Sequence, residues 1–259
     1  MRQSLWSSMI SKTEIKKIRS LDTKKGRDLH NRILIEGKRL VEQVMLSDCK
    51  IDKLWITEDF NDKNINFINK LNNIDTGIIS DSDLKKITAT QNSSGIVGIM
   101  EPPIGDIKKM NQRIIILDNI SDPGNLGTIL RTANWFGVSD ILLSDDCVDP
   151  YNSKVIRSAM GAHFNMNIVS GKIDSYIKKL QSEDFKIIAA DLDTDCSIKD
   201  LKISSNRWAL LMGSEAHGLS NSISDLVDYK IKIPQIGEIE SLNVSVACGI
   251  FLYHISSIK

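Results

Sequence analysis

The chain has 259 residues, which suits one large domain or two modest ones at about 150 residues each, and we expect two. Its 41% apolar and 25% charged residues are ordinary for a globular protein and exclude disorder, a collagen repeat and a coiled coil. Because 33 basic residues balance 33 acidic ones, a globally basic protein is excluded, and a nucleic-acid partner would have to bind a local patch.

A basic segment at the start of the chain is a candidate for such a patch. Residues 1–39 hold eleven Lys and Arg against four Asp and Glu, a net charge of +7, so the remaining 220 residues carry −7. Charge alone does not distinguish an RNA-binding surface from a solvated helical face. If the segment binds RNA, the best candidates for phosphate contacts are Lys24, Lys25, Arg27 and Arg39.

The cysteines exclude two kinds of site. Cys49, Cys147, Cys196 and Cys248 are far apart, with no CxxC pair and no neighbouring histidine, so we expect no disulfide framework, no metal site and a cytoplasmic protein.

No apolar run approaches the roughly 18 residues that cross a bilayer, so no membrane partner is expected. A Ser- and Arg-containing start leaves an organelle transit peptide as an alternative, although Glu14 counts against it.

The N-terminal third predicts a small α/β domain. Helical periodicity begins at Ser11, a Lys-Lys-Gly-Arg sequence at 24–27 breaks it, and a strand at 33–35 precedes a helix that runs to Met45. Further strands are expected at 53–57, 76–79 and 95–100.

Consecutive prolines at 102 and 103 interrupt both periodicities, which favours a domain boundary there. We therefore expect an N-terminal domain over 1–102, a linker over 103–112 and a C-terminal domain over 113–259. In the last of these, apolar runs alternate with helical patterns, which is typical of a mostly parallel sheet buried on both faces. The runs lie at 113–118, 140–144, 165–169, 186–191, 208–212 and 229–233.

Three loops follow strands of that sheet and predict one site, because parallel strands bind ligands at their carboxyl ends. The first loop, 119–125, precedes a helix expected near Gly127 or Thr128, so Arg131 would lie in its first turn, where a cation opposes the helix dipole. A surface arginine after an ordinary turn is the alternative.

The second loop is GSEAHG at 213–218, with Glu215 at its tip and glycines that allow close backbone approach. The third runs from Ile233 into a helix expected near Ser241, and Ser241 by itself is equally well a helix N-cap. Together the loops offer an amide, a guanidinium, a carboxylate and hydroxyls. This set indicates binding and positioning of a ligand more than nucleophilic catalysis.

Three segments carry a family resemblance. DPGNLGTILRTA, LLMGSEAHGLS and IPQIGEIESLNVSVACGIFLY resemble, in order and spacing, the motifs of SpoU/TrmH-type RNA ribose 2'-O-methyltransferases of the SPOUT superfamily. Upstream, KKGRDLHNRILIEGKRLVEQVM and SSGIVGIM are similar to the substrate-binding domain of many members. The resemblance spans nearly the whole chain from about Ile15.

The resemblance implies an α/β substrate-binding domain followed by a SPOUT domain with a trefoil knot, a homodimer, and S-adenosylmethionine as cofactor without a metal. It places the catalytic residues at Arg131, Asn125, Glu215, Ser241 and Asn243. It places the cofactor against backbone near Met212, Gly213, Ile233, Gly237 and Leu242.

The implied reaction agrees with the residues present, because an in-line methyl transfer needs alignment and the handling of one proton. A guanidinium is a poor general base, so we expect Arg131 to bind phosphate and to stabilise developing oxyanion character. Large-subunit ribosomal RNA is the expected substrate. Transfer RNA, methylation of a base nitrogen and a non-catalytic RNA-binding or ribosome-assembly protein are alternatives, and the modified nucleotide cannot be read from the sequence.

Overall fold

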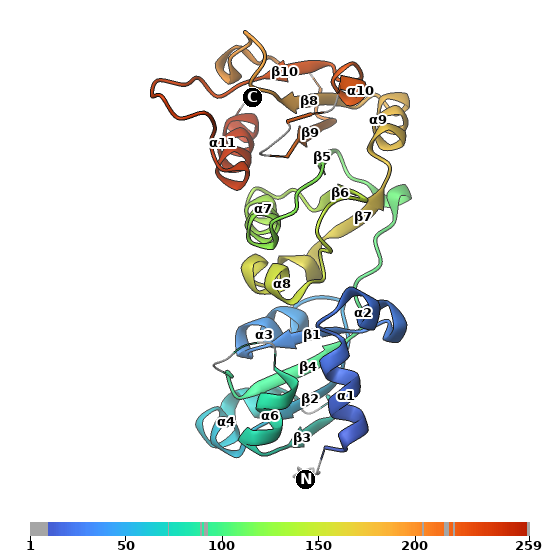
Figure 1. The fold of residues 1–259 in the computed structure, drawn as a ribbon, viewed down its shortest axis with the longest axis vertical. Coiled ribbons are helices and arrows are strands. Elements are labelled where there is room, and N and C mark those ends of the chain that lie inside the picture. Colours follow the sequence, from blue (N-terminus) through green and yellow to red (C-terminus); the bar gives the residue numbers. More distant parts are fainter. Residues whose placement is uncertain are drawn as a thin grey trace. The chain divides into compact units, whose positions relative to one another are not determined.

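The structure is a computed structural model that describes residues 10–71, 73–88, 90, 93–203, 205–214, 218–219 and 221–257, with backbone only at 221 and 222. It divides the chain into two compact units (Figure 1). The N-terminal unit comprises Met1–Pro102 and Tyr151–Phe164, and the C-terminal unit comprises Pro103–Pro150 and Asn165–Lys259. The segment Tyr151–Phe164 was expected in the C-terminal domain, but Ile156 and Phe164 are buried in the core of the N-terminal unit.

The N-terminal unit is a four-stranded sheet in the order β1-β4-β2-β3, in which only β2 and β3 pair in parallel. Its strands are β1 (Ile33–Glu36), β2 (Ile51–Ile56), β3 (Thr76–Ile78) and β4 (Ile96–Met100). Its helices are α1 (Lys12–Ser20), α2 (Lys24–His30), α3 (Lys38–Met45), α4 (Glu58–Lys63), α5 (Ile65–Ile68), α6 (Asp81–Ile87) and α8 (Ser153–Ala159), with 3-10 turns η1 (Asn69–Leu71) and, at its end, η3 (Ala162–Asn165).

Alternate residues of these strands face two separate cores, because successive side chains of a strand point to opposite faces. Ile33 and Ile35 of β1 belong to the core that contains α3, α4 and α5. Leu34, between them, belongs to the core that contains residues of α1 and α6. The sheet is therefore covered by helices on both faces.

A helix lies where the sequence predicted a break, at Lys24–His30. Thr23 caps it by accepting a hydrogen bond from the Gly26 amide at 3.1 Å. A Cβ on Gly26 would lie 1.9 Å from the main-chain oxygen of Ser20, so only glycine allows α2 to pack against the end of α1. The Lys-Lys-Gly-Arg sequence was wrongly interpreted as a loop because glycine is here a packing requirement and not a helix breaker.

The C-terminal unit is built on a six-stranded sheet in the order β10-β8-β9-β5-β6-β7, with every described pair parallel. Its strands are β5 (Arg113–Leu117), β6 (Asp140–Ser144), β7 (Asn167–Gly171), β8 (Lys186–Ala190), β9 (Trp208–Met212) and β10 (Tyr229–Ile231). Its helices are α7 (Pro123–Trp135), α9 (Ile173–Ser182), α10 (Asn221–Ser224) and α11 (Val244–Ser257), with 3-10 turns η2 (Ile107–Lys109) and η4 (Ile198–Asp200).

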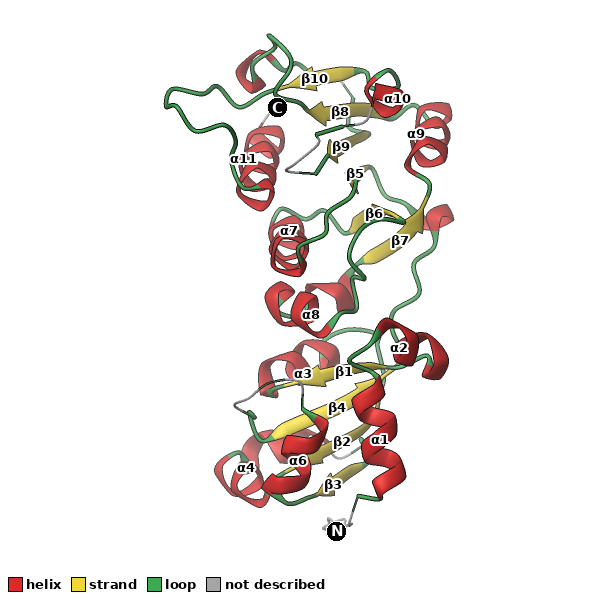
Figure 2. Ribbon diagram, in the orientation of Figure 1, coloured by secondary structure: helices red, strands yellow, loops and turns green. Residues whose placement is uncertain are grey.

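Figure 2 shows α7 and α11 on one face of this sheet and α9 on the other. Ile114 and Ile116 of β5 pack with buried residues of α9. Within residues 103–112, expected as a linker, Asp106 is bound to β7: its main-chain N–H donates to Asn167 Oδ1 at 2.7 Å. The α/β class with a parallel C-terminal sheet is confirmed, and the trefoil knot stays a prediction.

Two helix starts in this unit differ from expectation. Helix α7 begins at Pro123, not near 127, because Asp122 is its N-cap and proline is favoured at the first helical position. Arg131 therefore lies in the third turn and not the first. Helix α11 begins at Val244 and not near Ser241. Its cap is Asn243, whose Oδ1 accepts from the amides of Ser245 and Val246.

Candidate functional site

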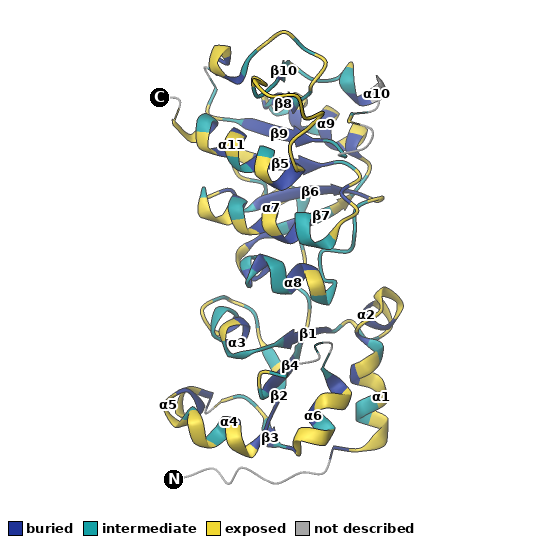
Figure 3. Ribbon diagram, turned by 60° about the vertical axis from the view of Figure 1, so that its left-hand side comes forward, coloured by how far each residue is buried: buried dark blue, intermediate teal, exposed yellow. Residues whose placement is uncertain are grey.

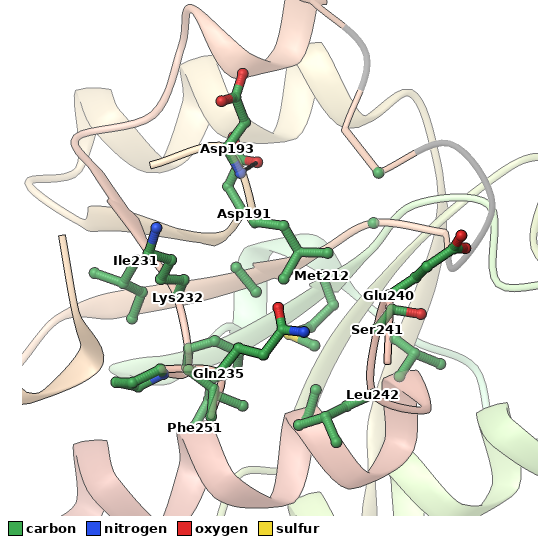
Figure 4. Close-up of a pocket in the computed structure, with 18 of the residues that line it drawn as sticks. Asp191, Asp193, Met212, Ile231, Lys232, Gln235, Glu240, Ser241, Leu242 and Phe251 are labelled. Atoms are coloured by element: carbon green, nitrogen blue, oxygen red, sulfur yellow. Dashed lines mark hydrogen bonds between the residues drawn. The ribbon is translucent and has the colours of Figure 1, made fainter. Parts of the chain in front are cut away.

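A pocket of about 450 Å³ opens at the carboxyl ends of β8, β9 and β10 (Figure 4). Three segments line it: the end of β8 with Asp191, the end of β9 with Gly213, and the loop between β10 and α11 with Gln235 and Leu242. Phe251 of α11 adds an aromatic side chain. Pockets of this volume accommodate a nucleoside-sized ligand.

All five residues expected to hold the cofactor line this one pocket, namely Met212, Gly213, Ile233, Gly237 and Leu242. They come from the ends of β9 and β10 and from the loop that follows β10. These segments meet because β9 and β10 both flank β8 and run parallel to it. Ser241, expected to be catalytic, also lines the pocket.

The glycines of the β9 loop have the geometric role that the sequence suggested. A Cβ on Gly213 would lie 2.4 Å from the main-chain oxygen of Gly218, so a side chain there would force the loop open. The Gly218 amide donates to the Ser214 carbonyl at 2.9 Å, and Gly218 has a φ of +62°, which favours glycine. Glu215, predicted to be catalytic at the tip of this loop, lies outside the described residues.

The side chain of Gln235 makes two hydrogen bonds within the loop after β10. Gln235 Nε2 donates to the main-chain oxygens of Gly237 at 2.8 Å and of Ile239 at 2.7 Å. Because Ile236 and Ile239 of this loop are themselves exposed, the conformation does not rest on burial of these two side chains. We refer to these two bonds as the Gln235 staple.

The structure brings two of the expected catalytic residues together outside the pocket lining. Asn243 Nδ2 donates to Asn125 Oδ1 at 2.9 Å, which joins the start of α11 to the start of α7. Arg131 is exposed, and within the described part of the chain it makes no ion pair and does not line the pocket. Of the expected catalytic residues that the structure describes, Ser241 lines the pocket, while Asn125, Asn243 and Arg131 do not.

An acidic residue and a thiol lie at the neighbouring strand ends. Burial raises the pKa of Asp118, at the end of β5; a hydrogen bond with Ser144 opposes this rise in pKa and the charge of Asp146 adds to it. Burial also raises the pKa of the Cys147 thiol, and raises that of Cys248 to about 12. Both thiols are therefore protonated at neutral pH, which agrees with a site that uses no cysteine nucleophile.

The sequence did not single out Asp191 and Gln235, although both line the pocket. Asp191 directly follows β8, and this position after a predicted strand was the available signal. Its Oδ1 accepts a hydrogen bond from the Asp193 amide at 3.0 Å, which fixes the turn. No pattern in the sequence reveals that Gln235 folds back on its own loop.

In the N-terminal unit, three of the four expected RNA contacts are on the surface. Lys24 and Lys25 are exposed in the first turn of α2, and Arg39 is exposed in α3. Arg27 does not fit the role expected of it, because it is only 6% exposed and its Nη1 donates to the carbonyls of Leu21 at 2.8 Å and Asp22 at 3.0 Å. It stabilises the connection between α1 and α2.

None of the described helices is long and apolar enough to span a bilayer. Within the same residues, no group of three or more His, Cys, Asp and Glu side chains is arranged to hold a metal ion.

Sequence comparison assigns families to both parts of the chain. Residues 112–253 match the SpoU rRNA Methylase family, and residues 12–98 match the MRM3-like substrate binding domain. The 23S rRNA (guanosine(2553)-2'-O)-methyltransferase RlmP of Bacillus subtilis is 29% identical over 246 residues, covering 93% of this chain and 95% of that protein. The 23S rRNA (adenosine(1067)-2'-O)-methyltransferase of Streptomyces azureus is 30% identical, covering 70% of this chain and 69% of its own.

Solved structures have the same fold. The AdoMet-bound rRNA methyltransferase from Sinorhizobium meliloti superimposes with a TM-score of 0.82 at 28% sequence identity, covering 95% of each chain.

Proposed function

Because the chain belongs to the SpoU rRNA methylase family, we propose that it transfers a methyl group from S-adenosylmethionine to a ribose 2'-hydroxyl of large-subunit ribosomal RNA. The observation that carries the proposal is the pocket at the strand ends, which gathers all five residues expected at the cofactor. The names of the relatives from Bacillus subtilis and Streptomyces azureus, both 23S rRNA 2'-O-methyltransferases, support the choice of RNA and of the hydroxyl.

The residues that line the pocket fit an adenosine-containing cofactor. Ile233, Leu242 and Phe251 offer apolar surface for a purine, while Asp191 and Ser241 offer polar groups for hydroxyls. Gly213 lines the pocket without a side chain, so main chain is what it offers to a ligand. When bound, S-adenosylmethionine supplies an electrophilic methyl group, so the protein needs no nucleophile of its own.

Arg131 is assigned to the RNA and not to the cofactor. Its guanidinium is exposed on α7 and offers a planar set of donors that match a phosphate. In this role it holds the phosphate of the target nucleotide and stabilises negative charge on the attacking 2'-oxygen, while the proton leaves to phosphate or water.

The N-terminal unit supplies affinity for RNA. Lys24, Lys25 and Arg39 are exposed cations of this unit, and phosphate contacts of this kind position an RNA without reading its sequence. The match of residues 12–98 to a substrate-binding family supports this assignment.

A second copy of the chain is proposed to complete the site. Val246, Ile250 and Tyr253 are exposed on α11 at helical spacing, and Trp135 of the neighbouring α7 is 85% exposed. Figure 3 shows exposed stretches on both helices. Apolar surface of this kind marks an interface. Since Arg131 does not line the described pocket of its own chain, a partner's arginine beside this pocket would form the full site. The cytoplasmic location stays a prediction.

The function is tested by incubating the protein and labelled S-adenosylmethionine with total RNA from cells that lack the enzyme. We expect label in large-subunit ribosomal RNA and resistance to alkali at one phosphodiester bond, because a 2'-O-methyl group removes the attacking hydroxyl. Label in transfer RNA, or in a base, would overturn the proposed substrate or acceptor. No label together with no binding of S-adenosylmethionine would favour a non-catalytic RNA-binding protein.

A further inference from the structure

A side-chain hydrogen bond connects two motifs that lie 118 residues apart in the sequence. Asn243 Nδ2 donates to Asn125 Oδ1 at 2.9 Å. The resemblance assigns both residues to catalysis, yet neither lines the described pocket. Their contact therefore calls for a role that does not require touching the cofactor.

The helix cap fixes which way the Asn243 amide points. Its Oδ1 accepts from the Ser245 amide at 3.0 Å, the Ser245 hydroxyl at 2.6 Å and the Val246 amide at 3.3 Å. These are first-turn groups of α11, whose amides have no acceptor within the helix. With the oxygen toward α11, the NH₂ group faces Asn125, which must present its oxygen in return.

The main chain of Asn125 is held at the start of α7. Its main-chain N–H donates to the Asp122 carboxylate at 2.8 Å, and Pro123 lies in the first turn of the same helix. Both residues thus lie at capped helix starts, which fixes the main chain at each end of the bond.

The two helices run in the same direction beyond this bond. A Cβ on Gly249 of α11 would lie 3.6 Å from Thr132 Cγ2 of α7. Gly249 is six residues after Asn243, and Thr132 is seven residues after Asn125. Arg131 is next to Thr132. Arg131 is six residues after Asn125, so at about 100° per residue its side chain projects roughly 120° away from that of Asn125 around the helix axis. A rotation of α7 at Asn125 would therefore change the direction of the Arg131 side chain.

The Asn125–Asn243 hydrogen bond also lies next to the pocket, at the end of the loop between β10 and α11. Leu242 and Val244, the neighbours of Asn243, both line the pocket. The hydrogen bond thus joins the segment that lines the pocket to α7, the helix that carries Arg131.

We infer that Asn125 and Asn243 form a positioning pair that sets the Arg131 helix relative to the pocket wall, and this inference rests on the proposed function. The pair couples the conformation of the loop between β10 and α11 to the direction of Arg131, which in the proposed dimer reaches the pocket of the partner. Neither residue needs to touch substrate, so both are positioning residues and not catalytic ones.

The test uses carboxylates, which accept hydrogen bonds but do not donate them when ionised. Asn125→Asp keeps the acceptor that Asn243 needs. Asn243→Asp keeps the helix cap, but it can pair with Asn125 only if that amide turns over. In the double variant two carboxylates meet without a donor. For each protein we would measure the affinity for S-adenosylmethionine by calorimetry, the thermal unfolding midpoint, and kcat and KM for the RNA.

We expect Asn125→Asp to stay within about threefold of the wild type in kcat and cofactor affinity, since its bond is retained. The double variant should lose about tenfold more in both than the product of the single changes, with KM for RNA little altered. Asn134→Asp, which adds the same charge at an exposed site of α7, is the matched control and should leave all values unchanged.

Two results would overturn the inference. If the loss of kcat and of cofactor affinity in the double variant equals the product of the losses in the two single variants, the two residues act independently. A large loss of kcat in Asn125→Asp, equal to that of Asn125→Ala, would show that its NH₂ group, and not its oxygen, is what the reaction needs. Absence of methyl transfer by the wild type, with coupled effects on cofactor affinity intact, would instead overturn the proposed reaction and leave the positioning pair standing.

Discussion

The sequence predicted the wrong position for Arg131 within its helix. The sequence placed it in the first turn of its helix, where a cation would oppose the helix dipole. The structure places it in the third turn, exposed, where the dipole has little effect. Its exposure and its planar donors, not its place near a helix start, are what suit it to an RNA phosphate.

We predict that Arg131→Lys lowers methyl transfer by about 100-fold, because lysine keeps the charge but lacks the fork that binds phosphate and the 2'-oxygen together. Affinity for S-adenosylmethionine and the thermal unfolding midpoint should not change, since Arg131 is exposed and does not line the described pocket. Single-turnover kinetics at saturating cofactor measure the effect. Near-normal turnover in the lysine variant would contradict the phosphate-binding role.

The raised pKa of Asp118 leads to a prediction about how the stability of the fold depends on pH. Burial raises the pKa of its carboxyl above the ordinary value of 3.8, so the folded protein holds this proton more tightly than the unfolded chain does. The wild type therefore loses stability as the pH rises from below 3.8 through the raised pKa. The side-chain amide of an Asp118→Asn variant stays neutral at every pH and can still pair with the hydroxyl of Ser144.

The unfolding midpoint of Asp118→Asn, relative to the wild type, should therefore be higher at pH 7 than at about pH 3.5. Thermal unfolding of both proteins at the two pH values tests this. A midpoint difference that is independent of pH would show that burial of this carboxylate has no energetic effect.

At the scale of elements, short loops with few buried side chains shape the site. The loop between β10 and α11 lines the pocket with Ile233, Gly237 and Leu242, yet Ile236 is fully exposed. Its conformation depends on the Gln235 staple and on the Asn243 cap. Since exposed loops are the least stable parts of a fold, these polar contacts decide whether the pocket is preformed.

We predict that Gln235→Glu weakens binding of S-adenosylmethionine about tenfold, because a carboxylate cannot donate to the carbonyls of Gly237 and Ile239 and is repelled by them. Calorimetric titration measures the change. Glu238→Gln, an exposed change in the same loop that does not line the pocket, should leave the affinity unaltered. Equal affinity in the glutamate variant would mean that the staple does not organise the pocket.

The whole molecule has an uneven distribution of charge, which bears on RNA binding. The first 39 residues carry +7 and the rest −7, and Lys24, Lys25 and Arg39 are the exposed cations assigned to phosphate contacts. Arg27 has the same charge but is buried against main-chain carbonyls.

Replacing Lys24, Lys25 and Arg39 together by alanine should weaken RNA binding and reduce the slope of log K against log salt by about 2, since each phosphate contact adds roughly 0.7–0.9. Arg27→Met should lower the unfolding midpoint and leave that slope unchanged. Titrations with ribosomal RNA at several salt concentrations distinguish the two. An unaltered slope in the triple variant would remove these residues from the RNA interface.

The oligomeric state is a prediction at the same scale. Val246→Asp with Tyr253→Asp should convert the proposed dimer to a monomer and abolish methyl transfer, because two carboxylates cannot be buried against the same surface of a partner. Light scattering after size-exclusion chromatography measures the mass. Leu46→Asp, at an exposed apolar position of the N-terminal unit, should leave the dimer intact. A wild-type protein that is monomeric and still transfers methyl groups would contradict the proposed dimer.

The sequence by itself determined the features that depend on local pattern. The strands of the parallel sheet were located within about two residues because buried apolar runs are read directly from the chain. Each of the three predicted loops follows a strand of the sheet, although the first is shorter than predicted, and the family that they indicate is confirmed. Helix starts were less well determined, since Asp122-Pro123 resembles a turn as much as an N-cap followed by a first-turn proline.

Only the tertiary structure decided what depends on neighbours distant in sequence. It buried Arg27 while leaving Lys24 and Lys25 exposed, because the end of α1 offers carbonyls to one cation and not to the others. It joined Asn125 to Asn243, since the order of the strands brings α7 and α11 side by side. Composition and periodicity record which residues prefer burial, but which polar groups meet is fixed by the packing of elements.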